Sequence, residues 1–163
     1  MQKRLYLDID GVLVAHQPRA AVQLQEGLSA RLAAEKGDPR IAAISHRLLS
    51  QFLAAFDAGA LDRVRRLQKE FALEIVLTSS WRVLYSLDFM QALFHVFDLE
   101  LDRFLPQGFP RSSLILADAA GAGAWIAIDD MDMRKQLGHH QILTDNVLSE
   151  ADYEKARRQL LVQ

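Results

Sequence analysis

Two aspartates stand two residues apart in the segment LYLDIDGVLV, which spans residues 5–14. The apolar residues before them have the length and composition of a buried strand in a parallel sheet. Asp8 and Asp10 would project from the end of that strand toward the same side, and Gly11 lets the backbone turn sharply after them. Because two half-buried carboxylates repel each other unless a cation offsets their charge, the pair favours Mg²⁺, which prefers carboxylate oxygens and phosphate ligands. An Asp-Gly turn at a strand end is the alternative interpretation.

Two later segments, 72–78 and 124–128, also have the composition of buried strands, and each ends in polar side chains. These are the hydroxyls of Thr78, Ser79 and Ser80 after the first segment and the carboxylates of Asp129 and Asp130 after the second. The carboxyl ends of parallel neighbouring strands meet at one edge of the sheet, where ligands bind. We therefore expect carboxylates and hydroxyls to converge there on a metal ion and a phosphate. A serine-rich helix N-cap explains the hydroxyl cluster equally well.

Helical patterns connect these strands, so the chain alternates between strand and helix as α/β proteins do. The expected helices are 20–35, 40–57, 61–71, 85–97, one that begins at Arg111 and ends near Gly121, and 150–161 with a capping-box start at Ser149 and Asp152. A short fourth strand is expected at 141–143. The fold class predicted is a three-layer Rossmann-like domain with a central parallel sheet.

The first two expected helices follow directly on the first strand and are separated by the Gly37-Asp38-Pro39 turn. We interpret residues 1–163 as a single domain and residues 18–58 as a small helical insertion beside the site, which could act as a cap. The alternative is that these two helices pack into the core of the main domain.

Composition excludes several classes of protein. The 163 residues are half apolar and a quarter charged, which is typical of a globular domain. The lack of cysteine excludes disulfides, thiolate catalysis and cysteine-ligated zinc. A formal net charge of −2 gives no extended surface for nucleic acid. No apolar run reaches membrane-spanning length and no signal peptide is evident, so we expect a cytoplasmic protein; the alanine-rich helices could support a homodimer.

The motifs, in this order, resemble those of the haloacid dehalogenase (HAD) superfamily of aspartate-dependent phosphohydrolases over residues 5–132, and more loosely through the final helix. Asp8-Ile9-Asp10 matches the first motif of that family, Thr78 the second, with Ser79 as an alternative, and Asp129-Asp130 the acidic pair. The run LTSSW and the strand WIAIDD look most like the small HAD domains associated with RNA-repair enzymes.

One motif departs from the family pattern. The superfamily commonly has a lysine before the acidic pair, but no lysine occurs between Lys69 and Lys135. Arg111 is the best positional match for that basic residue, and Arg82 and Arg103 are alternatives.

The resemblance implies a role for each residue. Asp8 would attack phosphorus to form an aspartyl-phosphate, and Asp10 would protonate the leaving alcohol and then activate water. Mg²⁺ would be held by Asp8, the backbone carbonyl of Asp10 and Asp130, with Asp129 orienting the ligands. Thr78, Ser79 and Arg111 would bind the phosphoryl oxygens. The substrate implied is a phosphorylated small molecule, a nucleotide or a nucleic-acid end.

Two other classes use similar residues. Phosphoaspartate receiver domains place their acidic pair after the first strand and the phosphorylated aspartate on a later one, which is the reverse of the order here. A catalytically inactive HAD-like binding domain is the stronger alternative because the usual lysine is missing.

The two tryptophans have different expected roles. Trp81 could stack on a substrate base or pack in the core, whereas Trp125 lies inside a strand and is expected to be structural.

Overall fold

The apolar runs form a five-stranded parallel sheet in the computed structural model, which describes residues 1–17 and 21–163. The strands are β1 (Arg4–Leu7), β2 (Glu74–Leu77), β3 (Arg103–Phe104), β4 (Trp125–Asp129) and β5 (Gln141–Leu143). Their order in the sheet is β3-β2-β1-β4-β5, so the direction of winding reverses between β1 and β4. A site that binds a ligand is expected beside such a reversal, at the carboxyl ends of the strands.

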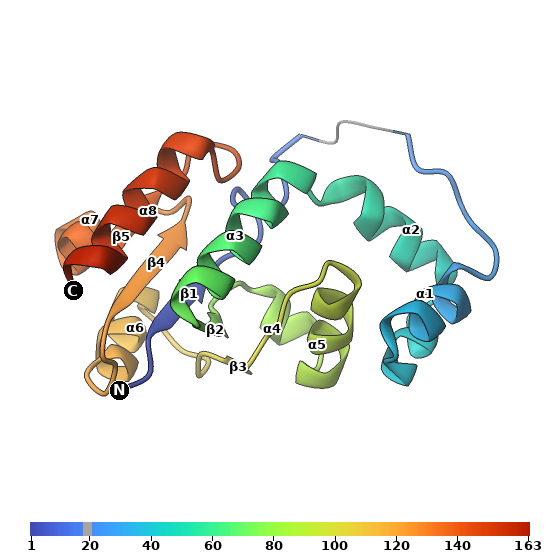
Figure 1. Ribbon diagram of the computed structural model, residues 1–163, viewed down its shortest axis with the longest axis horizontal. Helices are drawn as coiled ribbons and strands as arrows, with labels where there is room; N and C mark the ends of the chain where they lie inside the picture. Colours follow the sequence, from blue (N-terminus) through green and yellow to red (C-terminus); the bar gives the residue numbers. More distant parts are fainter. Residues whose placement is uncertain (18–20) are drawn as a thin grey trace.

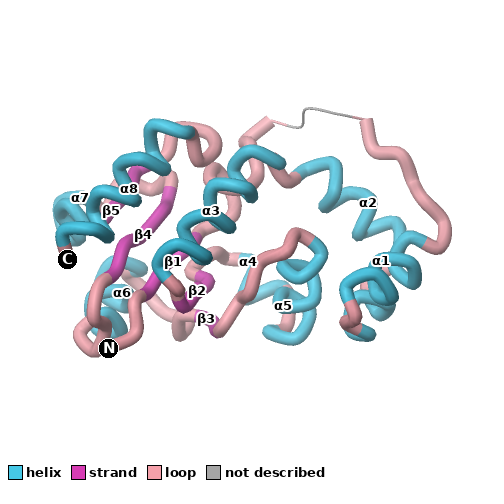
Figure 2. The backbone as a smooth tube through the Cα atoms, viewed as in Figure 1, coloured by secondary structure: helices cyan, strands magenta, loops and turns pink. Residues whose placement is uncertain are grey.

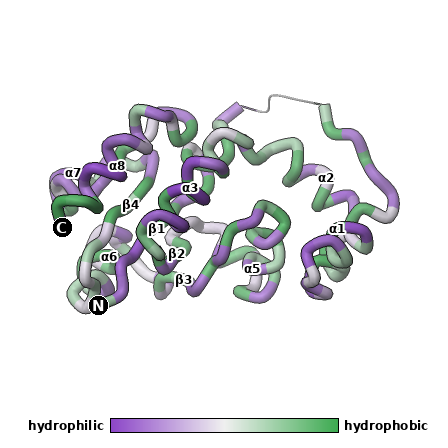
Figure 3. The backbone as a smooth tube through the Cα atoms, in the orientation of Figure 1, coloured by the Kyte–Doolittle hydropathy of each residue, from purple (hydrophilic) through white to green (hydrophobic). Residues whose placement is uncertain are grey.

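Helices cover both faces of the sheet, as the predicted three-layer Rossmann-like class requires (Figure 1). On one face, α3 (Ala58–Phe71) and α8 (Glu150–Val162) pack against a large apolar cluster that includes Leu5 and Leu7. On the other face, α6 (Arg111–Ala119) and α7 (Arg134–Leu137) pack against a smaller cluster around Tyr6. The alternation of Leu5, Tyr6 and Leu7 between the faces is the period-two pattern of a strand buried on both sides. Hydrophilic and hydrophobic residues also alternate along α3, with the period of a helix that packs one face on the sheet (Figure 3).

A group of helices, called the helical insertion below, follows β1 and lies to one side of the sheet (Figure 2). It consists of α1 (Leu28–Lys36), the short helix η1 (Pro39–Ala43) and α2 (His46–Ala55). Polar contacts join it to α5 (Leu87–Val96): Arg40 Nη1 donates to Gln91 Oε1 at 2.9 Å, and His95 Nδ1 lies 2.6 Å from Asp38 Oδ2. Hydrogen bonds from Arg40 and His95 hold the pKa of Asp38 below its usual range.

The insertion contains less helix than we expected. The helix predicted over 20–35 begins at Leu28, and residues 21–27 form none; residue 20 and the first residues of the segment 18–58 lie outside the described part of the chain. Val22 and Leu24 are exposed, so this stretch has no apolar face to bury, and Gly27 has a φ of 71° just before the helix. The helix predicted over 40–57 is also wrong as one element, because a new helix begins after Ser45, whose side chain caps α2.

Two further elements were not predicted. The helix predicted over 85–97 is confirmed as α5, which begins at Leu87 because Ser86 accepts a hydrogen bond from the N–H of Phe89, but a separate short helix, α4 (Trp81–Leu84), precedes it. The sheet has one strand more than expected, since the two-residue strand β3 pairs with β2. The helices predicted at 61–71, from Arg111 and at 150–161 are confirmed, as is the Ser149–Asp152 capping box. No helix in residues 1–17 or 21–163 is long and apolar enough to cross a membrane.

Candidate active site

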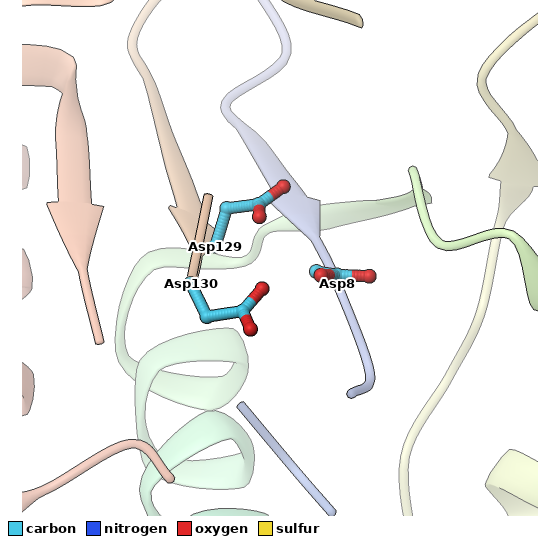
Figure 4. Close-up of side chains that lie close together, drawn as sticks. All are labelled: Asp8, Asp129 and Asp130. Atoms are coloured by element: carbon cyan, nitrogen blue, oxygen red, sulfur yellow. The ribbon is translucent and has the colours of Figure 1, made fainter. Parts of the chain in front are cut away.

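Three carboxylates meet at the point where the winding of the sheet reverses. Asp8 follows β1 directly, and Asp129 and Asp130 stand at the end of β4, the strand beside it (Figure 4). Because Leu7 pairs with Ile128, the residues that follow each strand lie at the same level. Oxygens of the three carboxylates lie within 4.8 Å of one another. Asp8 is 5% exposed and Asp129 is 1% exposed, so two of the three groups are largely removed from water.

Among the residues that the structure describes, the guanidinium of Arg111 faces this group of acids. Arg111 is the first residue of α6, and its Nη1 lies 2.6 Å from Asp129 Oδ2 and 3.5 Å from Asp8 Oδ2. A single positive charge cannot balance three carboxylates if all of them ionise. An oxygen-only set of this kind fits Mg²⁺, which binds through carboxylates and keeps positions for water and phosphate.

The other two basic candidates are engaged elsewhere. Arg103 lies in an ion-pair network, with its Nε 2.8 Å from Glu74 Oε1 and its Nη2 2.8 Å from Asp118 Oδ2. Arg82 is buried, and its guanidinium donates to the backbone carbonyls of Thr78, Ser79 and Leu105. Among the described residues, Arg111 is therefore the basic candidate placed beside the strand-end acids.

Crowding and burial change the acidity of the site. Burial and then the charge of Asp129 raise the pKa of Asp8 to about 7, against the opposing effect of Arg111. Burial also raises the pKa of Asp129. Both shifts mean that the ionised pair is unfavourable without a compensating cation. Binding of a divalent ion would therefore reduce the repulsion between these carboxylates.

Gly11 makes room for Asp130. Its φ is 76°, which side chains other than glycine rarely adopt, and a Cβ built there would lie 2.3 Å from Asp130 Oδ2. The hydroxyl of Thr144, just after β5, donates to the carbonyl of Gly11 at 2.6 Å and fixes this turn. The glycine is thus needed for a side chain of the protein itself as well as for the turn.

The remaining predicted residues lie at the same edge but in different surroundings. Thr78 and Ser79 are buried directly after β2, and the backbone N–H of Thr78 donates to the carbonyl of Leu7 at 2.9 Å. Asp10 is exposed, and its Oδ2 accepts a hydrogen bond from Trp81 Nε1 at 3.0 Å. Within the described residues, the Asp10 side chain is not part of the three-carboxylate group.

Sequence reasoning missed one neighbour of the acids. His16 Nε2 lies 3.1 Å from Asp130 Oδ2, and the backbone N–H of His16 donates to Asn146 Oδ1 at 3.0 Å. The histidine stands in an irregular loop, and no spacing in the sequence relates it to the end of β4.

Trp125 stacks on His140 with ring centres 3.9 Å apart, in agreement with the structural role expected for it.

The raised pKa of Asp8 predicts how stability depends on pH. Without Mg²⁺, the folded protein holds a proton on Asp8 that the unfolded chain releases near pH 4, so the free energy of unfolding should fall as pH rises toward about 7. Mg²⁺ competes with that proton, and its stabilising effect should therefore grow between pH 5.5 and pH 8. Thermal unfolding with Mg²⁺ or EDTA at the two pH values measures this. A Mg²⁺ effect independent of pH would contradict the cluster as the binding site.

A family model described as a HAD domain in Swiss Army Knife RNA repair proteins matches residues 4–152. No curated protein and no solved structure matches the chain significantly. The matched range includes the acids after β1 and β4, the hydroxyls after β2 and the start of α6. The match to a HAD domain supports phosphohydrolase activity in general. The chain belongs to the HAD superfamily, in the family of HAD domains found in Swiss Army Knife RNA repair proteins.

Proposed function

We propose that the protein is a Mg²⁺-dependent phosphohydrolase that cleaves phosphomonoesters through an aspartyl-phosphate on Asp8. The observation that carries this proposal is the position of Asp8 at the reversal of the sheet, with Arg111 Nη1 3.5 Å from its Oδ2 and the acids of β4 beside it. A nucleophile, a cationic side chain that can bind phosphate and a set of metal ligands thus lie together at one edge of the sheet.

The chain supplies a group for each step. An oxygen of Asp8 attacks phosphorus and forms a P–O bond as the bond to the leaving oxygen breaks, and Asp10 gives that oxygen its proton. In the second step, Asp10 takes a proton from water, which attacks the phosphorus of the aspartyl-phosphate. Phosphate leaves, and the carboxylate of Asp8 is restored.

The other residues would hold the phosphoryl group and the metal. Arg111 would bind phosphoryl oxygens by charge-assisted hydrogen bonds, with help from the hydroxyls of Thr78 and Ser79. The carboxylates of Asp8, Asp129 and Asp130 and the backbone carbonyl of Asp10 would hold Mg²⁺. When bound, the ion neutralises negative charge as a carboxylate approaches an anionic phosphate.

Phosphate release by the purified protein tests the proposal. p-Nitrophenyl phosphate, phosphorylated metabolites, nucleotides and oligonucleotides with 5′- or 3′-phosphates would be assayed with Mg²⁺ and with EDTA. We expect release that requires Mg²⁺ from at least one class. If Mg²⁺ binds but no ester is hydrolysed, the protein is instead a HAD-like binding domain.

A cleft beside Arg111 favours a nucleotide or a nucleic-acid end as the substrate. Its volume is about 440 Å³, within the range of small-molecule sites, and it extends from α4 to the loop after β4. Phe109, which lines it, is 94% exposed. An exposed aromatic ring next to a phosphate-binding arginine is a suitable surface for a base. The description of the matching family, which names RNA repair, supports the same substrate class.

Replacing Phe109 by Ala should weaken binding of substrates that carry a base. Loss of one stacking contact is expected to raise KM for a nucleoside monophosphate about tenfold and to leave kcat nearly unchanged. Ribose 5-phosphate, which lacks a base, should be unaffected. Leu84→Ala, at an exposed residue of α4 outside the cleft lining, is the matched control. An equal rise in KM for both substrates would argue against stacking on Phe109.

A further inference from the structure

The indole of Trp81 contacts the proposed acid/base directly. Its Nε1 donates to Asp10 Oδ2 at 3.0 Å. The bond joins α4, of which Trp81 is the first residue, to the loop after β1, which carries Asp10. An exposed aspartate on a loop has several rotamers available, and a hydrogen bond to one oxygen selects among them. The indole N–H is a donor that does not titrate in water, so it can orient the carboxylate without exchanging a proton with it.

The indole is itself held by aromatic side chains. The Trp81 ring centre lies 5.3 Å from that of Phe52, 5.7 Å from that of Phe56 and 5.9 Å from that of Tyr85. Phe52 belongs to α2 of the helical insertion, and Phe56 follows that helix directly. Rings at these separations make favourable tilted and edge contacts that restrict the orientation of the indole.

The backbone of Trp81 is fixed as well. Its N–H donates to Ser79 Oγ at 3.2 Å, and its carbonyl accepts from the N–H of Tyr85 at 2.9 Å. The position of the indole N–H is therefore fixed in two ways. The end of β2 holds the backbone of Trp81 through Ser79, and the insertion holds its ring through Phe52. A shift of α2 would be transmitted to the Asp10 carboxylate through the indole.

We infer that Trp81 is a positioning residue for Asp10 and that the helical insertion acts on the chemistry through this indole. The inference rests on the proposed function, in which Asp10 protonates the leaving oxygen. Because the indole takes Oδ2, the transferred proton can be carried by the other carboxylate oxygen, which has no hydrogen bond to the described residues. Trp81 thereby serves proton transfer to the leaving group, in place of the stacking or purely core role considered from sequence.

The test compares two leaving groups in Trp81→Phe, which keeps an aromatic ring and removes the N–H. An alkyl phosphate needs a proton on its leaving oxygen, whereas p-nitrophenolate departs as an anion and needs less help. We expect kcat for the alkyl ester to fall at least about tenfold more than kcat for p-nitrophenyl phosphate, with similar KM values. Trp125→Phe, the same change at the far end of the site-bearing strand β4, should leave the ratio unchanged.

Two further variants complete the test. Phe52→Leu loosens the indole without touching its N–H and should shift the ratio in the same direction by a smaller factor. In an Asp10→Asn background, Trp81→Phe should have no further effect on the alkyl ester, because the group it positions is already lost.

Equal losses on both esters in Trp81→Phe, or a full additional loss in the Asp10→Asn background, would overturn the inference. If Trp81→Phe does not fold, an unchanged ratio in Phe52→Leu overturns it instead. Failure of the proposed function gives a different result: the wild-type protein then releases phosphate from neither ester.

Discussion

Asp8→Asn is expected to abolish Mg²⁺-dependent phosphate release, with a loss in kcat of at least about a thousandfold. The amide cannot form the P–O bond that the first step requires, and it is nearly the same size as the carboxylate it replaces. Asp8 is almost fully buried between Asp129 and Arg111, so no other carboxylate can take its place without rearranging the site. Initial rates of phosphate release from the best substrate measure the effect.

Stability separates lost chemistry from a lost fold. Asn at position 8 removes the group whose pKa is raised to about 7, so the variant without Mg²⁺ should be at least as stable as the wild type at pH 8. Its free energy of unfolding should also depend less on pH. Asp62→Asn is the matched control and should keep wild-type turnover, because Asp62 is exposed on α3, lies outside the cleft lining and pairs with Arg65 at 3.6 Å. Undiminished turnover by Asp8→Asn would exclude Asp8 as the nucleophile.

The strand ends could be predicted from the sequence because each buried strand is an apolar run that stops abruptly at polar residues. Once β1 and β4 are parallel neighbours, the pairing of Leu7 with Ile128 brings Asp8 and Asp129 together without further information. The start of α6 at Arg111 was also predictable, since Pro110 immediately precedes it and proline is common at helix starts. The general position of the site could therefore be predicted from local patterns in this one sequence.

Contacts between loops could not be predicted in the same way. The bond from Trp81 to Asp10 and the pair of His16 with Asp130 each involve a residue in the loop after β1, and no periodicity sets its position relative to its partner. Tertiary packing also decided the secondary structure of the insertion. Val22 and Leu24 have helical spacing with later apolar residues, but both side chains are exposed, and residues 21–27 are not helical.

Arg111→Ala is expected to lower kcat/KM by about a hundredfold to a thousandfold, because the substrate loses its charge-assisted contact. The variant should also be less stable at pH 8, since Asp8 and Asp129 lose the positive charge that lies 2.6 Å from one of them and 3.5 Å from the other. Without that charge their pKa values rise further, and the fall in the free energy of unfolding with rising pH should become steeper.

Arg111→Lys separates charge from geometry at this position. Lysine restores a positive charge of the kind that the superfamily commonly has there but lacks the planar fork of arginine, so partial recovery of kcat/KM is expected. Arg103→Ala is the control: it breaks the pairs with Glu74 and Asp118 and should lower stability while leaving KM unchanged. If Arg103→Ala raised KM as much as Arg111→Ala, the loss would reflect general destabilisation, and Arg111 would not be the phosphate-binding residue.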